Sequence, residues 1–299
     1  MNSMTIIIMA IIVMIVFAWL GMLLLQKMIR EAAGSEVIQE AVPLEMLPSG
    51  LEGLKILFIS DIHRRVIDPD LPRQVEKLGG AELVLIGGDV RETGVKLQQV
   101  RDNMRLLRSI APAYAVFGNH DYDEDITELD ACLRAEDVTV LQNRFTLVDL
   151  PGRTSFKLAG TDDPRTKRDR LEETLKTPLM PHKKALELFG GEAPFTLLLA
   201  HDPILAHRCR HSGIAANLVL SGHTHGGQII LPLLGPAMRT ASVRKFRAGW
   251  FDLPAPLAWQ KTGPSKVRLL VSQGYGTSKA PIRLNCPPVI HLLSLERAD

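Results

Sequence analysis

The sequence predicts an α/β domain preceded by one N-terminal transmembrane helix. The first observation behind this prediction is a long apolar run without charges at the N-terminus. The second is that, beyond Gly53, short runs rich in Leu, Ile and Val alternate with polar loops and amphipathic stretches. Such apolar runs are typical of strands buried on both faces, and the amphipathic stretches between them are typical of crossover helices. The 299 residues suffice for this helix and one large domain.

The apolar run extends from Met4 to Leu25, and its length of about 22 residues is enough to cross the ~30 Å hydrocarbon core of a bilayer. A cleaved signal peptide is the alternative, but its apolar stretch would be shorter, and this run lacks a basic n-region and a clean cleavage site. Lys27 and Arg30 follow the run, so the positive-inside bias places the following domain in the cytoplasm. We therefore expect a single-pass protein of the inner (plasma) membrane.

The composition divides the chain into three segments. We predict a transmembrane anchor at residues 1–30, a linker of mixed Gly, Pro, Ser and acidic residues at 31–53, and one domain at 54–299. The 35 Lys and Arg residues against 33 Asp and Glu residues give a net charge of +2, which carries no specific nucleic-acid signal. The three cysteines are widely spaced and form no Cys-x-x-Cys pair, so a reducing compartment is favoured over a disulfide framework.

Five apolar runs of the domain each end in a polar loop that carries Asp, His or Asn. These loops are Asp61-Ile62-His63, Gly87-Gly88-Asp89, Gly118-Asn119-His120-Asp121, His201-Asp202-Pro203 and Gly222-His223-Thr224-His225-Gly226-Gly227. Taken alone, each loop is more often a turn whose side chains form local hydrogen bonds. Ligands, however, gather at the carboxyl ends of parallel strands, and five such ends with oxygen or imidazole donors indicate a metal site.

The C-terminal part of the chain contains four further apolar runs. They lie near residues 228–231, 249–253, 267–272 and 289–295. We interpret them as a second sheet that packs on the first, which gives a β-sandwich flanked by helices.

The five polar loops resemble the signature of the calcineurin-like metallophosphoesterase superfamily: Asp-x-His, Gly-Asp, Gly-Asn-His-Asp or Glu, a lone His, and Gly-His-x-His. The resemblance covers about Leu54 to Glu296, with all five blocks in order. Three further segments resemble a bacterial membrane-associated branch: Thr161-Asp162-Asp163-Pro164, Gly226-Gly227-Gln228 and Gly274-Tyr275-Gly276-Thr277-Ser278. The resemblance implies a calcineurin-like α/β/β/α fold and hydrolysis of a phosphate ester or diphosphate bond.

The resemblance also implies two divalent metal ions and seven ligands. One ion would take Asp61, His63 and His225, the other would take Asn119, His201 and His223, and Asp89 would bridge both. Oxygen and imidazole ligands without thiolate suit Mn²⁺, Fe or Zn²⁺, of which Mn²⁺ is our first choice. Two cations about 3.5–4 Å apart lower the pKa of a bridging water and polarise phosphoryl oxygens, so no covalent nucleophile is needed.

Three more residues are candidates for the chemistry. His120 follows a ligand and is expected to protonate the leaving group, the alternative being a simple strand-end cap. Asp121 is expected to accept a hydrogen bond from the far ring nitrogen of His120 and to fix its orientation. Arg64 is a candidate for binding the substrate phosphate, although an Arg in a loop is usually solvated. The basic run at 165–170 is interpreted as a solvated helix start, or as a surface facing anionic headgroups.

Two functions of different classes follow. The first is a dimetal hydrolase of a phosphomonoester, phosphodiester or diphosphate, and the anchor favours a phosphorylated small molecule or a lipid-linked substrate such as UDP-diacylglucosamine, which the resemblance suggests. The second is a non-catalytic, metal-bound module that binds a partner at the membrane. The complete ligand pattern and His120 favour the enzyme.

Overall fold

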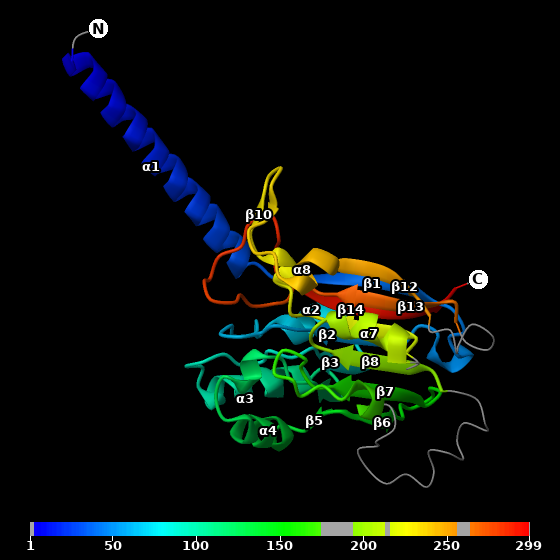
Figure 1. The fold of residues 1–299 in the computed structure, drawn as a ribbon. Coiled ribbons are helices and arrows are strands. Elements are labelled where there is room, and N and C mark those ends of the chain that lie inside the picture. The colour runs from blue at the N-terminus through cyan, green and yellow to red at the C-terminus, as the bar shows by residue number, and fades with distance from the viewer. Residues whose placement is uncertain (1–2, 175–193, 213–215, 256–263, 299) are drawn as a thin grey trace.

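The computed structural model describes residues 3–174, 194–212, 216–255 and 264–298. In this part of the chain, two six-stranded sheets pack face to face, and helices cover their outer faces. One long helix, α1 (Ser3–Ala33), projects away from the body (Figure 1). The predicted α/β/β/α arrangement with an apolar N-terminal helix is therefore confirmed.

The first sheet contains the strands that precede three of the polar loops. Its strands, in spatial order, are β1 (Glu36–Leu44), β14 (Val289–Arg297), β2 (Lys55–Ile59), β3 (Leu83–Ile86), β4 (Ala113–Ala115) and β5 (Val138–Val140). Strands β2 to β5 are parallel, so each needs a crossover to the next. The helices on its outer face are α2 (Leu71–Lys77), α3 (Leu97–Arg108) and α4 (Ile126–Ala135).

The second sheet contains the strands that precede the other two loops. Its strands, in spatial order, are β12 (Gly249–Pro254), β13 (Lys266–Val271), β9 (Leu218–Ser221), β8 (Thr196–Ala200), β7 (Phe156–Thr161) and β6 (Arg144–Val148). The inner four are parallel, and β12 and β6 pair antiparallel at the edges. The helices that follow its strands are α5 (Leu171–Thr174), α7 (Ile204–Ser212) and α8 (Ala241–Lys245).

The core follows from the two-residue period of the strands. In β2, Phe58 points between the sheets and packs in the same apolar cluster as Leu197 and Leu270 of the second sheet. Its neighbour Ile59 points the other way, into the cluster formed with α3 that contains Met104. Because these strands are buried on both faces, their sequences are continuously apolar rather than alternating.

The linker predicted at residues 31–53 was wrong. Helix α1 continues to Ala33, and β1 then pairs in parallel with β14 along its whole length, followed by the 3₁₀ turn η1 (Ser49–Leu51). Val42 and Leu44 of this strand are buried against the core between the sheets. The strand was missed because Glu36, Gln39 and Glu40 interrupt its apolar residues and it contains Pro43, so that the segment resembles a tether by composition.

The placement of two late apolar runs was also wrong. Strand β14 belongs to the first sheet, where His291 pairs with Phe58 of β2. The run near residue 230 forms β10 (Ile230–Leu231), which pairs with β11 (Gly235–Pro236) in a separate hairpin. The choice of sheet depends on which neighbour supplies backbone hydrogen bonds, and the apolar pattern does not encode this partner.

Candidate metal centre

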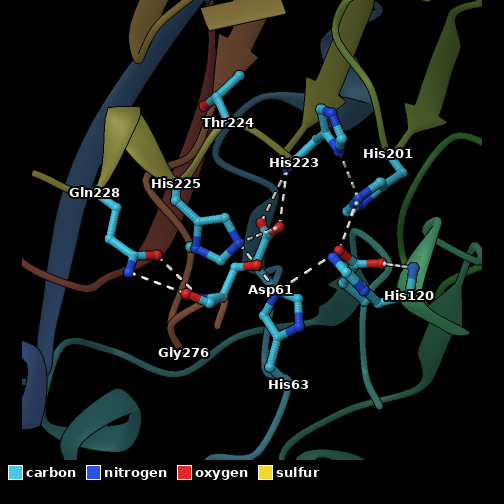
Figure 2. Close-up of polar contacts among 12 residues, drawn as sticks. Asp61, His63, His120, His201, His223, Thr224, His225, Gln228 and Gly276 are labelled. Carbon is cyan, nitrogen blue, oxygen red and sulfur yellow. Dashed lines mark hydrogen bonds and ion pairs between the residues drawn. The ribbon is translucent and has the colours of Figure 1, made fainter. Parts of the chain in front are cut away.

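The five polar loops meet at one end of the sandwich. Each follows a strand, β2, β3 and β4 in the first sheet and β8 and β9 in the second, so the carboxyl ends of both sheets contribute. Figure 2 shows the imidazoles of His63, His201, His223 and His225 gathered around Asp61. The side chains predicted as metal ligands are therefore brought together by the fold.

One group consists of Asp61, His63 and His225, which are all buried and could hold a metal ion. The two Nε2 atoms of His63 and His225 lie 3.0 Å apart, and His225 Nε2 lies 3.5 Å from Asp61 Oδ1. Two imidazole nitrogens and one carboxylate oxygen thus converge on a single point, as ligands of one cation do.

A second group lies beside the first. Asp89 Oδ2 lies 3.2 Å from His201 Nε2 and 3.6 Å from His63 Nε2, so one carboxylate oxygen stands between the two groups. His223 Nδ1 lies 3.2 Å from His201 Nε2. Asn119 Oδ1 is buried and accepts no hydrogen bond from any described residue. A buried amide oxygen without a donor is costly unless a ligand supplies the missing contact, so these residues fit a bound cation.

The loops hold several of these residues in an unfavourable backbone conformation. Asp61, His63, Asp89, His223 and His225 have φ values between 48° and 68°, in the left-handed region. This region costs a non-glycine residue about 1–2 kcal/mol and concentrates at functional sites. The backbone preferences of these residues therefore do not explain the conformation of the loops. The convergence of their side chains on common points does explain it.

Gly118 allows a close approach of two loops. A Cβ atom at this position would overlap Asp89 Oδ1 and would lie 2.6 Å from the backbone nitrogen and 2.7 Å from Cγ of Asp89. The absence of a side chain is therefore required for the Asp89 carboxylate to reach its position between the histidines.

The electrostatics favour neutral imidazoles at His63 and His225. Burial lowers the pKa of His63 to about 4, and burial together with the neighbouring His63 lowers the pKa of His225. At His201, burial lowers the pKa, but the charge of Asp89 and its hydrogen bond outweigh burial and raise the pKa. Burial alone would raise the pKa of Asp89, but the attraction of His201 and its hydrogen bond outweigh this effect and lower the pKa. Neutral imidazole and ionised carboxylate are the states that bind a metal ion.

A cavity of about 470 Å³ opens beside these groups. The residues that line it include Asp89, Asn119, His120, His223 and His225. Its other lining residues include two cations, Arg165 and Lys279, and the apolar side chains of Ile229, Met238 and Val243. A molecule in this cavity would contact the candidate ligands and an apolar wall at the same time.

Comparison with known proteins identifies the family. Residues 54–227 match the model of the calcineurin-like phosphoesterase family. The chain belongs to this family. It is 34% identical over 271 residues to the uncharacterized protein YpbG of Bacillus subtilis, and the match covers 90% of this chain and 91% of that protein. This phosphoesterase is therefore a metal-dependent hydrolase of phosphoric esters, and its Asp and His groups could hold the divalent ions that the family uses.

Two other relatives concern activity and membrane association. The phosphoesterase is 29% identical over 250 residues to phosphodiesterase YaeI of Escherichia coli, which covers 81% of this chain and 82% of that protein. It is 34% identical over 200 residues to the transmembrane protein with metallophosphoesterase domain of Bos taurus, which covers 63% of this chain and 44% of that protein. Within the described residues, α1 is long and apolar enough to cross a membrane, which together with this relative indicates membrane association.

The predicted role of Asp121 was wrong. Its carboxylate accepts hydrogen bonds from the backbone nitrogens of Asp89 at 2.9 Å, Gly118 at 2.8 Å and Arg91 at 3.0 Å. The residue that contacts the His120 ring is Asp123, whose Oδ2 lies 2.7 Å from Nδ1. Asp121 therefore holds together the loops that carry Asp89 and Gly118, and the short 3₁₀ turn η2 (His120–Tyr122) leaves its side chain buried.

The predicted role of Arg64 in binding the substrate phosphate stays a prediction. Its guanidinium is turned toward Glu92, at 3.3 Å, and it is not among the residues that line the cavity. Arg165, interpreted from the sequence as part of a solvated helix start, lines the cavity instead, and its Nη1 lies 3.1 Å from His223 Nε2. Its loop is fixed by Asp163, which accepts a hydrogen bond from the Arg165 nitrogen at 2.8 Å. The Asp162-Asp163-Pro164 segment was the available sequence signal for this loop.

Sequence reasoning also missed Arg283. This side chain is fully buried, and its Nη2 lies 3.5 Å from His225 Nδ1 while donating to the carbonyl of Gln273 at 2.8 Å. A buried guanidinium behind a candidate ligand histidine fixes the orientation of the ring and disfavours its protonation. Arg283 lies far along the chain from the polar loops, so no local pattern indicated it.

Proposed function

We propose that the protein is a dimetal phosphodiesterase that cleaves a phosphodiester or diphosphate bond in the cavity beside His120. The observation that supports this proposal is the position of Asp89 Oδ2 between His63 and His201, next to the candidate ligands of both ions. A shared carboxylate allows two cations to lie close together despite their repulsion.

In the proposed assignment, each ion has its own ligands. Asp61, His63 and His225 hold one, Asn119, His201 and His223 hold the other, and Asp89 bridges them. The donor set contains oxygen and nitrogen but no thiolate, which suits Mn²⁺, Fe or Zn²⁺, and we propose Mn²⁺. When bound, the two ions would supply an activated nucleophile and neutralise charge on the phosphoryl group.

The chain's own residues would bind the phosphate and supply a proton. Arg165 and Lys279 are cations in the cavity wall and can donate to phosphoryl oxygens. His120 would protonate the leaving oxygen from Nε2, because Asp123 occupies Nδ1. Burial lowers the pKa of His120, but the charges of Asp89 and Asp123 outweigh burial and raise it, which favours the protonated acid.

The substrate that we propose carries a lipid or another large apolar group. The apolar wall formed by Ile229, Met238 and Val243 lies in the same cavity as the candidate ligands. Helix α1 would keep this cavity close to a bilayer and so raise the local concentration of a membrane-embedded substrate. UDP-diacylglucosamine is the first lipid-linked compound to test.

We further propose that α1 spans the plasma membrane and leaves the catalytic domain in the cytoplasm. Lys27 and Arg30 at the end of the span support this orientation through the positive-inside bias. A reporter fused at Asp299 tests the proposal: a signal from a cytoplasm-specific reporter is expected, and a signal only from a periplasm-specific reporter would reverse the orientation.

The activity can be tested with bis-p-nitrophenyl phosphate. Detergent-solubilised full-length protein should hydrolyse it with added Mn²⁺, and chelation should abolish the rate. Asp89→Asn is the matched control, because it removes the bridging charge with little change in side-chain volume. A metal-loaded wild-type protein with only the background rate would instead indicate a non-catalytic binding module. UDP-diacylglucosamine and a water-soluble nucleotide diphosphate, tested side by side, then distinguish a lipid-linked from a soluble substrate.

A further inference from the structure

An apolar hairpin projects from the body of the phosphoesterase. Its strands β10 and β11 are joined by Pro232, Leu233 and Leu234. The tip is open to solvent: Leu233 is 107% and Leu234 66% exposed. Two adjacent leucines at the end of a protruding hairpin form an apolar surface that the described residues leave uncovered, and such surfaces mark interaction sites.

Leu233 is unfavourable at the tip of a solvent-exposed turn, both in its backbone conformation and in its apolar side chain. Leu233 has φ of 65°, a conformation that Gly, Asn or Asp adopts more readily than a leucine does. Turn tips are usually polar, because loops run over the protein surface and are in contact with water. A leucine that is both strained and exposed is better explained by an apolar environment at the tip than by the stability of the turn.

The hairpin is held in place at its base. Ala237 donates a backbone hydrogen bond to the Ile229 carbonyl at 2.9 Å, and Ile230 donates to the Leu284 carbonyl at 2.8 Å. Arg239 Nη2 donates to the Leu234 carbonyl at 2.6 Å. These bonds satisfy backbone carbonyls near the tip and place a guanidinium immediately behind the leucines, at the level where anionic headgroups would lie.

The hairpin and α1 are fixed to the same segment of the chain. The Leu284 carbonyl accepts the hydrogen bond from Ile230 of the hairpin. The backbone nitrogen of its neighbour Arg283 donates to the Met28 carbonyl of α1 at 3.0 Å. The Cys286 nitrogen donates to Glu31 Oε1, also at the end of α1. Figure 1 shows the hairpin rising from the body beside α1, on the side from which α1 projects.

We propose that the hairpin tip, residues 231–234, inserts into the interface of the same bilayer that α1 spans. The proposal rests on the membrane span assigned to α1 under the proposed function. The occupant is a lipid surface because the apolar tip, the guanidinium behind it and the nearby membrane helix together match the depth profile of a bilayer interface. Ile229 and Met238 at the hairpin base line the cavity, so insertion would hold the cavity close to the membrane surface.

The test uses single cysteines labelled with an environment-sensitive fluorophore. The native Cys132, Cys209 and Cys286 are all buried, so an added surface cysteine can be labelled selectively. Leu233→Cys and Leu234→Cys report the tip, and Phe17→Cys, within α1, reports the span. Glu128→Cys is the control, because it is exposed on α4, at the opposite end of the molecule from α1 (Figure 1).

Each labelled full-length protein is reconstituted into phosphatidylcholine–phosphatidylglycerol vesicles that contain a nitroxide lipid. We expect labels at Leu233, Leu234 and Phe17 to emit at shorter wavelength, to be quenched by the nitroxide and to be protected from aqueous iodide. The label at Glu128 should show the opposite behaviour. Hydrolysis of bis-p-nitrophenyl phosphate at the wild-type rate shows that each labelled protein is folded.

The outcomes test the hairpin proposal and the membrane span of α1 separately. Tip labels that behave like Glu128, while Phe17 is quenched by the lipid, would overturn the hairpin proposal and leave the span intact. Absence of lipid quenching at both the tip and Phe17 would overturn both. Tip labels protected from iodide but not quenched by the lipid would mean that protein, such as a second copy of the chain, covers the tip, and this result also rejects the proposal.

Discussion

Replacing Gly118 by alanine tests whether the close approach of two loops positions Asp89, the carboxylate proposed to bridge the two ions. The added methyl group would overlap Asp89 Oδ1, and it would lie 2.7 Å from Asp89 Cγ. Restoring ordinary contact requires a movement of roughly 1 Å, and a displacement of this size at a reacting centre costs about 10²-fold in rate. Overpacking of a buried site also costs about 1–3 kcal/mol of unfolding free energy.

The assay combines hydrolysis of bis-p-nitrophenyl phosphate, metal content and thermal unfolding of the full-length protein. We expect kcat/KM of Gly118→Ala to fall by about 10²-fold or more. We also expect metal content to fall and the melting temperature to drop by several degrees. Gly34→Ala is the matched control, because its nearest neighbour, the Glu31 carbonyl, would lie at an ordinary 3.4 Å from the new methyl group. Wild-type activity and metal content in Gly118→Ala would show that Asp89 does not depend on this approach.

Three further predictions concern the ligands, the proton donor and the anchor. Asp89→Asn should lose hydrolysis together with bound metal, because the charge between two cations is removed, and normal metal content with a normal rate would contradict the dimetal proposal. His120→Ala should keep its metals but lower kcat by about 10²–10⁴-fold, with a smaller effect on substrates that have a good leaving group; loss of metal would instead make it a ligand. Removing residues 1–26 should give a soluble, active domain, whereas removing 1–53 also deletes β1, uncovers the edge of β14 and should give insoluble protein. Equal solubility of the two truncations would argue against a structural role for β1.

The seven predicted ligands were identifiable from the sequence because each follows an apolar run. A buried strand gives a continuous Val, Ile and Leu pattern, and the polar residues that end it are then conspicuous, as in Asp61-Ile62-His63 after β2. Parallel strands bring their carboxyl ends to one edge of a sheet, so the proximity of the loops within each sheet followed from the strands. The packing of the two sheets then decided that both edges meet at one site. Strand β1 was missed because Glu36, Gln39, Glu40 and Pro43 interrupt its apolar residues, so that no continuous apolar run marks it.

The tertiary structure decided the interactions between segments that are distant along the chain. The sequence alone determined the apolar helix, the α/β architecture and the types of candidate metal-binding side chains, because these depend on local periodicity and composition. The direction of one short turn decides whether the carboxylate of Asp121 or that of Asp123 contacts the ring of His120. Which cations line the cavity depends on long-range packing, which placed Arg165 there and turned Arg64 toward Glu92. Side-chain direction and strand partners result from contacts across the fold, and a linear pattern of residues does not contain them.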